Sequence, residues 1–426
     1  MAERADGTPR GRTWPRVHFY TDNPVLSGSE TTLYEVLRFL AEQGADPVLT
    51  VRTWPGYRPR QVGQLPDVGV DERPLGPPAL PVMLESVRVE GRPRLTALAR
   101  NTLDTLVRLP WFALAVLRLW VLFRRTRPDV VHVNNGGLPG ARSCTAAAVA
   151  ARLAGVPGVV YAVHNIAHDY RRPARWLDYP LERLMMRRPP IFVTGSEAAG
   201  RSLARVLRLS PAGHRVVPNA VVARPATADI DTLRDRCGID RRAGLVVSVA
   251  RLEVRKGHTV LLEALAELGE RGPTPLLLLA GEGPERAALE ARAAELGLSA
   301  QVRFLGASSH VRDLMEMADV VVLASVGFED FPVVVLEAMA ASRPVVATTV
   351  GGTVEQVVDE VSGLLVPPGD PRRLADAIGR VLADPAGAAR MGAAGRERFD
   401  RRFSSASVVD RYLEVYRAAA TAGPPA

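Results

Sequence analysis

Short runs rich in valine, isoleucine and leucine recur along the chain and alternate with amphipathic stretches. In the first half these runs are RVHFY (16–20), PVLTV, DVVHVN, GVVYAVH and IFVTGS; the second half restarts with GLVVSVA (244–250), LLLLAG (276–281), DVVVLAS (319–325) and PVVATTVGG (344–352). This alternation is typical of βα units around a parallel sheet. Since single cores stop growing near about 250 residues, the 426 residues predict an α/β protein with two Rossmann-like, doubly wound domains in tandem.

Changes in composition predict the domain boundaries. Residues 1–15 carry no long apolar run and predict a flexible tail, not a secretory signal. Residues 16–220 and 244–400 predict the two domains, with the polar segment 221–243 as the linker. Residues 401–426 predict a last helix and a tail. This helix either caps the second domain or packs back on the N-terminal domain.

Charge and cysteine content narrow the partners and the compartment. The net charge of +8 and the isoelectric point near 10 favour anionic partners. A nucleic-acid binder is disfavoured, because no basic stretch interleaved with aromatic residues is present. Cys144 and Cys237 lack the spacing of a zinc site or a disulfide framework. Together with the absence of a signal segment, this predicts a cytoplasmic protein.

One stretch bears on membrane contact. Leu109 to Phe123 (LPWFALAVLRLWVLF) is almost continuously apolar, but it is shorter than the roughly 20 residues that span a bilayer. It favours a buried or groove-lining helix. The alternative is a peripheral contact with the inner face of the membrane, for which Trp111, Trp120 and the arginines that follow are suitable.

The only lysine of the chain is Lys256, although lysine and arginine together number 54. It stands in RLEVRKG, directly after the apolar run GLVVSVA. Ligands of doubly wound sheets bind beyond the carboxyl ends of the strands. Arg251 and Lys256 are therefore predicted to converge on the phosphates of a ligand, the alternative being a pair of solvated surface charges.

Two common phosphate motifs do not match. A Walker A loop needs Ser or Thr after its lysine, whereas Gly257 and His258 follow Lys256. The segment GEGPER (281–286) lacks the third glycine of the dinucleotide fingerprint. These departures exclude a P-loop NTPase and disfavour a dehydrogenase.

A pair of glutamates flanks a predicted helix start. Glu329 precedes Pro332, which is suited to the first helical turn, and Glu337 falls in the second turn. The amino end of a helix attracts phosphate through its free N–H groups and dipole. Carboxylates are unfavourable beside phosphate unless they bind hydroxyl groups, so the pair implies a ligand that carries both phosphates and sugar hydroxyls.

The order of motifs in the second half resembles the donor-binding half of the GT4 family of retaining glycosyltransferases, which have the GT-B fold. The resemblance covers residues 244–385 and rests on RLEVRKG, LLLAGEGPE, VRFLG, DVVVLAS, EDFPVVVLEAMA, PVVATTVGG and SGLLVPPGD. The first half agrees more loosely, through SGSE (27–30), DVVHVN, AVHN, VTGSEA and VPNAV. The resemblance implies two domains that face each other across a cleft.

Carried over residue by residue, the resemblance implies roles in the second domain. Arg251 and Lys256 would bind the donor diphosphate, Glu329 the hydroxyls of the transferred sugar and Glu337 the ribose. The segment around Phe304 would lie near the base. Backbone groups from the segment after Glu329 would meet the sugar and phosphates, namely those of Phe331, Pro332 and Val333.

In the first domain, Gly28 would let the backbone approach the diphosphate, and His164 would face the sugar. His132 has a weaker claim to a role. The residues implied to act in the reaction itself are Arg251, Lys256, Glu329 and His164. The sequence departs from the family pattern at Ser27, Asp330 and Pro332, each of which stands where a glycine is usual, so the shape of the sugar pocket is left open.

The implied activity is a metal-independent transfer of a sugar, with retention, from a UDP- or GDP-linked donor to an acceptor in the N-terminal domain. No cofactor is expected. The acceptor is either a small molecule or lipid-linked. Two alternatives are a nucleotide-sugar epimerase of the same fold and a protein that binds nucleotide sugars without turnover.

Overall fold

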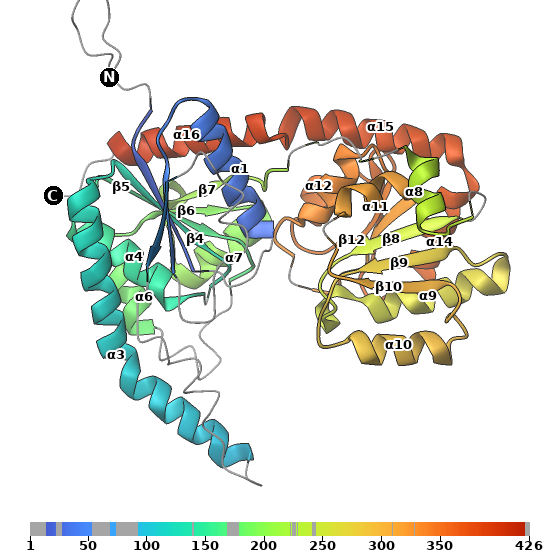
Figure 1. The fold of residues 1–426 in the computed structure, drawn as a ribbon, viewed down its shortest axis with the longest axis horizontal. Coiled ribbons are helices and arrows are strands. Elements are labelled where there is room, and N and C mark those ends of the chain that lie inside the picture. Colours follow the sequence, from blue (N-terminus) through green and yellow to red (C-terminus); the bar gives the residue numbers. More distant parts are fainter. Residues whose placement is uncertain are drawn as a thin grey trace, which may run out of the picture. The chain divides into compact units, whose positions relative to one another are not determined.

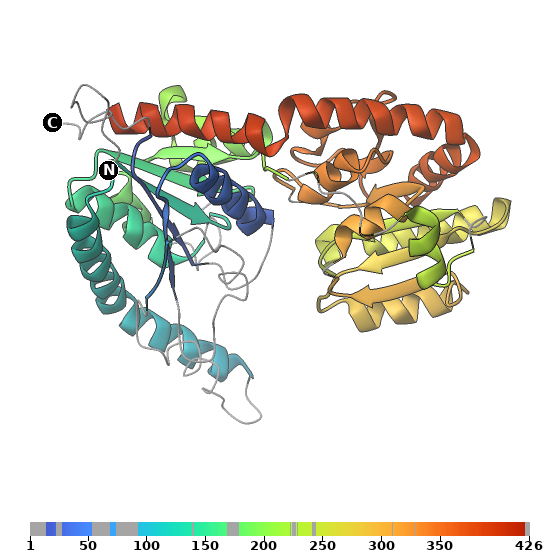
Figure 2. The same ribbon diagram turned by 45° about the horizontal axis from the view of Figure 1, so that its top comes forward.

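The computed structural model describes residues 14–22, 28–52, 69–73, 93–138, 140–167, 179–221, 223, 227, 229–240, 244–308, 310–327 and 329–421. The chain divides into two compact units, each built on its own parallel sheet (Figure 1 and, turned by 45°, Figure 2). Unit 1 comprises residues 1–194, 202–216 and 409–426, and unit 2 comprises residues 195–201 and 217–408.

Unit 1 contains a seven-stranded parallel sheet with the order β3-β2-β1-β4-β5-β6-β7. Its strands are β1 (Val17–Thr21), β2 (Val48–Arg52), β3 (Gly69–Arg73), β4 (Val130–Asn135), β5 (Gly158–Val163), β6 (Ile191–Thr194) and β7 (His214–Val216). Its helices are α1 (Gly28–Glu42), α3 (Pro93–Thr126), α4 (Arg142–Leu153), α6 (Tyr179–Met185), the part of α7 (Glu197–Leu207) from residue 202 onward, η2 (Pro211–Gly213) and most of α16 (Ser405–Thr421). The order runs outward from β1 and β4, so the sheet is doubly wound, as predicted.

Helices bury both faces of this sheet, because successive strand residues point to opposite sides. On one face, Tyr20 and Val131 join the core formed with α3 and α4. On the other face, Phe19 packs edge-on against Tyr416 of α16, and His132 Nδ1 lies 2.7 Å from the Tyr416 hydroxyl. The last helix therefore packs on unit 1, which is one of the two placements that the sequence left open.

Unit 2 contains a six-stranded parallel sheet with the order β10-β9-β8-β11-β12-β13. Its strands are β8 (Leu245–Val249), β9 (Leu276–Ala280), β10 (Val302–Gly306), β11 (Val320–Leu323), β12 (Val345–Thr348) and β13 (Gly363–Val366). Its helices are α8 (Ile230–Arg236), η3 (Val254–Lys256), α9 (His258–Arg271), α10 (Arg286–Glu295), α11 (Val311–Met317), α12 (Val333–Ala340), α13 (Thr353–Gln356), α14 (Pro371–Ala383) and α15 (Pro385–Arg402).

The strands of unit 2 are also buried on both faces. Val246 and Leu277 point into the core with α9 and α14. Their neighbours Val247 and Leu278 point into the opposite core, with α11 and α12. Burial on both sides explains why these strands are nearly continuous apolar runs in the sequence.

The segment predicted as a linker, 221–243, differs from that expectation, because part of it folds onto unit 2. Asp229 caps α8, and Leu233 and Ile239 are buried in the unit 2 core. The helix has only two turns and few apolar residues, so it leaves no strong periodic pattern in the sequence. The segment lies within the stretch 217–408, all of which belongs to unit 2.

Helix α3 contains the apolar stretch 109–123 and extends beyond it on both sides, with Pro110 inside the helix. One face packs into the unit 1 core through Trp111, Phe112, Ala115, Leu119, Leu122 and Phe123. On the opposite face Leu109 and Leu117 are 62% and 54% exposed. Within the described part of the chain, no helix has both the length and the apolar character that a bilayer crossing requires.

Candidate functional site

The carboxyl ends of β8 and β11 lie side by side, where the strand order of unit 2 reverses. The loop after β8 covers residues 250–257 and includes η3. The loop after β11 covers residues 324–332 and leads into α12. Such a switch point is where open α/β sheets bind ligands, because the two loops diverge there.

Lys256 and Glu329 meet across these two loops. The Lys256 Nζ lies 2.6 Å from Oε1 of Glu329, and Ser325 Oγ donates to the same oxygen at 2.5 Å. The Lys256 side chain is only 12% exposed and that of Glu329 6%. Two side chains that the sequence assigned to different parts of one ligand are thus brought into a charge-assisted pair. Ser325 was missed by sequence reasoning, although it ends the run DVVVLAS.

Gly257 makes this meeting sterically feasible. Its φ is 68°, in the left-handed region, and a Cβ at this position would lie 1.9 Å from the carbonyl oxygen of Ala324. The Val326 N–H donates to the carbonyl of Arg255 at 2.9 Å, which joins the two loops. Only glycine allows the backbone after Lys256 to adopt this conformation so close to the end of β11.

Arg251 and Arg255 add further positive charge to the loop after β8. Glu253 lies between them, 2.9 Å from Nε of each arginine. Arg255 Nη1 is 3.9 Å from Glu329 Oε1, whereas the Arg251 side chain is 56% exposed. Sequence reasoning did not select Arg255 or Glu253, although both stand in RLEVRKG. An exposed Arg251 held by one carboxylate is able to turn toward an anionic ligand.

Helix α12 begins one residue later than predicted. Pro332 is its N-cap, with φ −60° and ψ 121°, and Val333 is the first helical residue. Glu337 falls in the second turn, as predicted, and keeps part of its side chain exposed. One short helix, α12, therefore carries both a free amino end, just after Phe331, and the Glu337 carboxylate. It leads away from Glu329.

Glu337 is partly buried, and the desolvation of its carboxylate predicts a pH-dependent contribution to stability. Burial raises the pKa of Glu337 from 4.5 to about 7, and the nearby Arg312 only partly opposes the rise. Between these values the folded chain retains a proton that the unfolded chain releases, so the free energy of unfolding falls as the pH rises across this window. Glu337→Gln removes this titration. We expect its unfolding free energy, relative to the wild type, to increase by about 2 kcal/mol from pH 4.5 to pH 8 in urea titrations. Parallel pH curves for the two proteins would contradict the raised pKa.

The segment predicted to lie near a base is found on β10. Phe304 lies beside Arg286, whose guanidinium carbon is 5.9 Å from the ring centroid. Arg303 donates to the carbonyl oxygens of Cys237 and Gly238 at 2.6 and 3.2 Å. The guanidinium of Arg303 is thus hydrogen-bonded to the carboxyl end of α8. The Phe304 ring and the Arg286 guanidinium are the other planar groups of this segment.

The candidate residues of unit 1 lie at the carboxyl ends of β1, β4 and β5. Gly28 is the first residue of α1. His164 directly follows β5, and its Nε2 donates to Asn134 Oδ1 at 2.7 Å. Asn134 Nδ2 in turn donates to Glu30 of α1 at 3.3 Å. This chain of polar contacts fixes the ring orientation of His164. Glu30 and Asn134 were not selected from the sequence, although they lie in the quoted motifs SGSE and DVVHVN.

His132 is a core histidine. It is buried, stacks near Phe19 and is hydrogen-bonded to the Tyr416 hydroxyl. Burial, with a smaller contribution from His164, lowers its pKa to about 3. A neutral ring inside the sheet–helix interface anchors α16, which agrees with the weaker claim that the sequence supported for this residue.

Within the described residues, no group of three or more His, Cys, Asp or Glu side chains is arranged to hold a metal ion. The positive groups near Glu329 are Lys256 and Arg255.

Two doubly wound parallel sheets, one in each unit, are the architecture of the GT-B fold. Solved structures agree in fold: the crystal structure of HepE from Anabaena in complex with UDP matches with a TM-score of 0.75 at 20% identity, covering 95% of this chain and all of that chain. Sucrose-phosphate synthase from Thermosynechococcus elongatus matches with a TM-score of 0.73 at 22% identity, covering 95% of this chain and 99% of that one.

Sequence comparisons define the family. “Glycosyltransferase Family 4” matches residues 26–223, and “Glycosyl transferases group 1” matches residues 229–398. The chain is 35% identical over 300 residues to the 2-deoxystreptamine glucosyltransferase of Streptomyces kanamyceticus, covering 67% of this chain and 76% of that relative. The chain therefore belongs to family 4 of the glycosyltransferases, as the sequence motifs predicted.

Proposed function

We propose that the protein transfers a sugar from a nucleoside diphosphate donor, most suitably a UDP-sugar, to an acceptor bound by unit 1. The observation that carries this proposal is the contact of Lys256 with Glu329 at the switch point of unit 2. A phosphate near Lys256 and sugar hydroxyls near Glu329 are then adjacent, as they are in a nucleotide sugar. HepE has been solved in complex with UDP-glucose, which supports the choice of base.

Cleavage of the donor moves the electron pair of the bond between the anomeric carbon and oxygen onto the departing β-phosphate. In this proposal Lys256, Arg251 and the amino end of α12 stabilise this charge. The acceptor hydroxyl forms the new bond on the same face of the sugar and passes its proton to the departing phosphate oxygen, so the anomeric configuration is retained. We propose that these groups suffice without a metal ion or a cofactor.

The proposal is tested with a panel of UDP-, GDP-, ADP- and dTDP-sugars, scored by thermal shift and by slow donor hydrolysis. We expect saturable stabilisation by a UDP-sugar, undiminished in EDTA. Stabilisation by none of the donors would refute the function. A loss of donor hydrolysis in EDTA that Mg²⁺ restores would refute metal independence. Release of a rearranged sugar without acceptor would indicate an epimerase, and donor binding without hydrolysis or transfer a binding protein.

For the acceptor, we propose a small hydroxyl-rich ring such as a cyclitol or aminocyclitol. The 2-deoxystreptamine glucosyltransferase supports this class, because the acceptor in its name is an aminocyclitol. Cys144 and Cys237 are both free thiols, which supports a reaction in the reducing cytoplasm.

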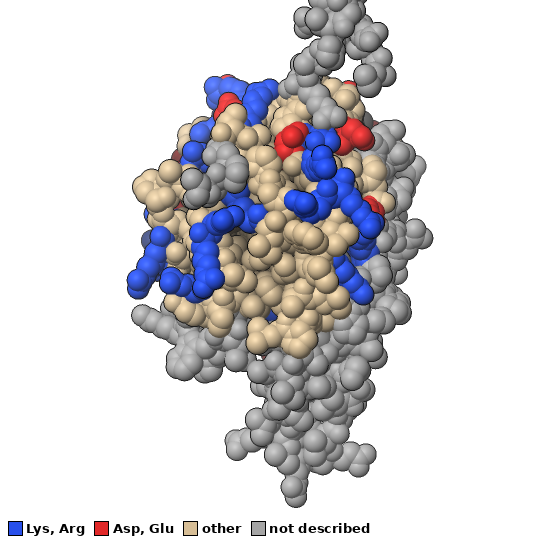
Figure 3. Space-filling model, turned by 90° about the vertical axis from the view of Figure 1, so that its left-hand side faces the viewer, with Lys and Arg blue, Asp and Glu red and all other residues tan. Residues whose placement is uncertain are grey.

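A lipid-linked acceptor is the second candidate, favoured by the surface of unit 1. The outward face of α3 exposes Leu109 and Leu117 and continues to the exposed arginines Arg124 and Arg125. In Figure 3, which shows the side of the molecule where α3 lies in Figure 1, basic side chains border a broad area without charged groups. Apolar residues framed by arginines are suited to an anionic membrane surface.

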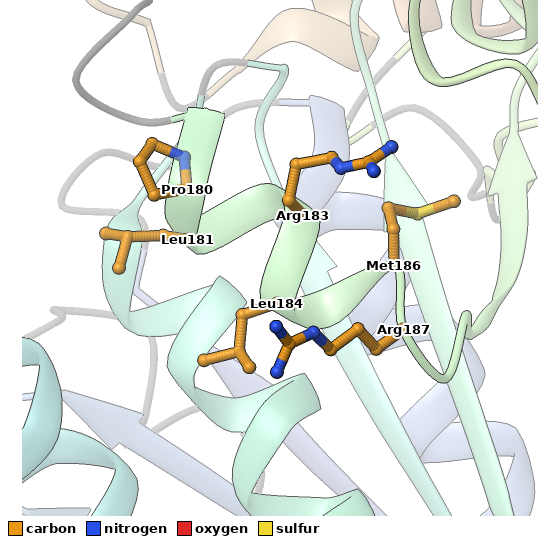
Figure 4. A pocket seen from close by; sticks show the side chains of 6 residues that line it. All are labelled: Pro180, Leu181, Arg183, Leu184, Met186 and Arg187. Carbon is orange, nitrogen blue, oxygen red and sulfur yellow. The ribbon is translucent and has the colours of Figure 1, made fainter.

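Residues of helix α6 line a pocket in unit 1 that, like the surface of α3, combines apolar and basic side chains. Its cavity volume is about 540 Å³, and it is lined by Pro180, Leu181, Arg183, Leu184, Met186 and Arg187 (Figure 4). Both guanidinium groups stand beside aliphatic side chains. An anionic headgroup with an acyl chain would find partners for both of its parts here.

Co-sedimentation with vesicles distinguishes the two acceptor classes. For a lipid-linked acceptor we expect binding to vesicles with 30% anionic phospholipid, weak binding to neutral vesicles, and at least a fivefold loss of binding for Leu117→Asp with Arg124→Glu. The matched control is Arg402→Glu, an exposed charge reversal on α15 of unit 2. Equal sedimentation with neutral and anionic vesicles, or none, would leave the small-molecule acceptor as the proposal.

A further inference from the structure

The four residues from Glu329 to Pro332, at the end of the loop after β11, are each held by a hydrogen bond. The carbonyl oxygen of Glu329 accepts from Gly352 N–H at 3.3 Å, and that of Phe331 accepts from Asn219 Nδ2 at 2.6 Å. The carbonyl oxygen of Pro332 accepts from Gln356 Nε2 at 2.9 Å. The residue between them, Asp330, is fixed through its side chain. A loop held in this way presents Glu329 in one orientation.

Asp330 is buried and grips the turn after β6 with both carboxylate oxygens. Oδ2 accepts from the N–H of Gly195 at 3.1 Å, and Oδ1 accepts from Ser196 Oγ at 2.7 Å. Ser196 Oγ also accepts from Ala199 N–H at 3.1 Å, which fixes its orientation. Burial raises the pKa of Asp330 to about 7, although these two hydrogen bonds oppose the rise. Burying a carboxylate costs free energy unless hydrogen bonds compensate for the loss of water, and Gly195 and Ser196 provide such bonds here.

The turn is shaped to receive this loop. A Cβ at Gly195 would lie 2.8 Å from Cβ of Phe331 and 2.9 Å from Oδ2 of Asp330. A Cβ at Gly352 would lie 1.8 Å from the carbonyl oxygen of Asp330 and 2.6 Å from Cβ of Ser196. Asp330 is therefore packed closely between Gly195, which contacts its carboxylate, and Gly352, which contacts its carbonyl oxygen. This close packing restricts the orientation of its side chain. The family pattern has glycine at this position, which offers no such side-chain contact.

We propose that Asp330 is a positioning residue for the donor site, one that fixes the loop with Glu329 and Phe331 by binding Gly195 and Ser196. This inference rests on the proposed function, since it takes Glu329 to bind the donor sugar. Asp330 contacts no reacting atom. It acts by limiting the orientations of its neighbour Glu329, so its removal weakens donor binding in the ground state and in the transition state alike.

The test is the steady-state kinetics of donor use by the full-length chain. We expect Asp330→Ala to raise the KM for the donor about tenfold while kcat stays within about threefold, because uniform binding is lost. Asp330→Asn should remain within about threefold of the wild type, since the amide accepts from Gly195 through oxygen and donates to Ser196 through nitrogen. A KM within twofold of the wild type for a folded Asp330→Ala would overturn the inference.

Ser196→Ala removes one of the two hydrogen bonds to the Asp330 carboxylate. It tests the inference if Asp330→Ala does not fold. We expect a KM increase of about threefold, and no further increase when it is combined with Asp330→Ala. An unchanged KM for Ser196→Ala, or additive effects in the double variant, would refute the shared contact.

Glu355→Ala is the matched control for a general loosening of the same segment. Glu355 accepts from the N–H groups of Glu197 and Ala198 at 2.8 and 3.0 Å, but holds no part of the Glu329 loop. We expect it to lower the Tm and to leave the donor KM within twofold. A KM increase equal to that of Asp330→Ala would mean that Asp330 acts only through stability. Absence of saturable donor use by the wild type would contradict the proposed function. The inference about Asp330 is contradicted only by the variants named above.

Discussion

Replacing Lys256 by alanine is expected to lower kcat by about 10² to 10³. Removing one preorganised donor from developing negative charge has effects of this size. The loss is increased because Glu329, whose Oε1 lies 2.6 Å from Lys256 Nζ, is left in a buried place without its cation. The measurement is single-turnover transfer with a saturating UDP-sugar, together with a thermal melt to confirm folding.

Two further substitutions make the Lys256 test specific. Lys256→Arg keeps the charge but introduces a longer, planar group into a site where the lysine is only 12% exposed, and we expect at least a tenfold loss of kcat. Arg255→Ala removes a cation of the same loop that is 3.9 Å from Glu329, and we expect a loss below tenfold. Activity of Lys256→Ala within twofold of the wild type would remove the leaving-group role.

Gly257→Ala is expected to destabilise unit 2 by about 3 to 5 kcal/mol, which is exceptional for a single methyl group. The new Cβ would meet the carbonyl oxygen of Ala324 at 1.9 Å, and the residue has a φ of 68°. The loops after β8 and β11 would have to separate, and with them Lys256 and Glu329. Denaturant unfolding measures the stability, and thermal shift by the donor measures whether the site survives.

Gly297→Ala is the matched control, since this glycine is in the same unit, has a φ of 72° and has nothing within 4 Å of a Cβ. It tests the backbone strain alone, for which we expect about 1 to 2 kcal/mol. Equal destabilisation by the two substitutions would show that the contact with Ala324 is unimportant.

The strands that sequence patterns did not reveal are the edge strands. Patterns predicted strands at each central position of both sheets, whereas β3, β7, β10 and β13 are the outermost strands of their sheets. An edge strand has only one neighbour, and β7 is less buried, with an exposed Arg215, so its sequence needs no continuous apolar run. The edge strand β13 (GLLV) is mostly buried, but it has only four residues.

The contacts within the site were beyond sequence patterns for a different reason. Position after a strand indicated Lys256 and Glu329 separately, 73 residues apart, but not that they touch. Arg303, next to Phe304, donates to the carbonyls of Cys237 and Gly238, which are 66 and 65 residues away in the sequence. Partners distant in sequence are brought together by the order of strands, which a local pattern does not encode.

The sequence by itself determined the α/β class, the two doubly wound sheets and the family, because short apolar runs and loop motifs are local properties that follow from burial and backbone geometry. Only the tertiary structure decided that the last helix packs on unit 1, that His132 is a core residue and that Asp330 binds the turn at Gly195 and Ser196. Each of these depends on which side chains meet after the strands are ordered, and the cost of burying a polar group without a partner then selects the pairing.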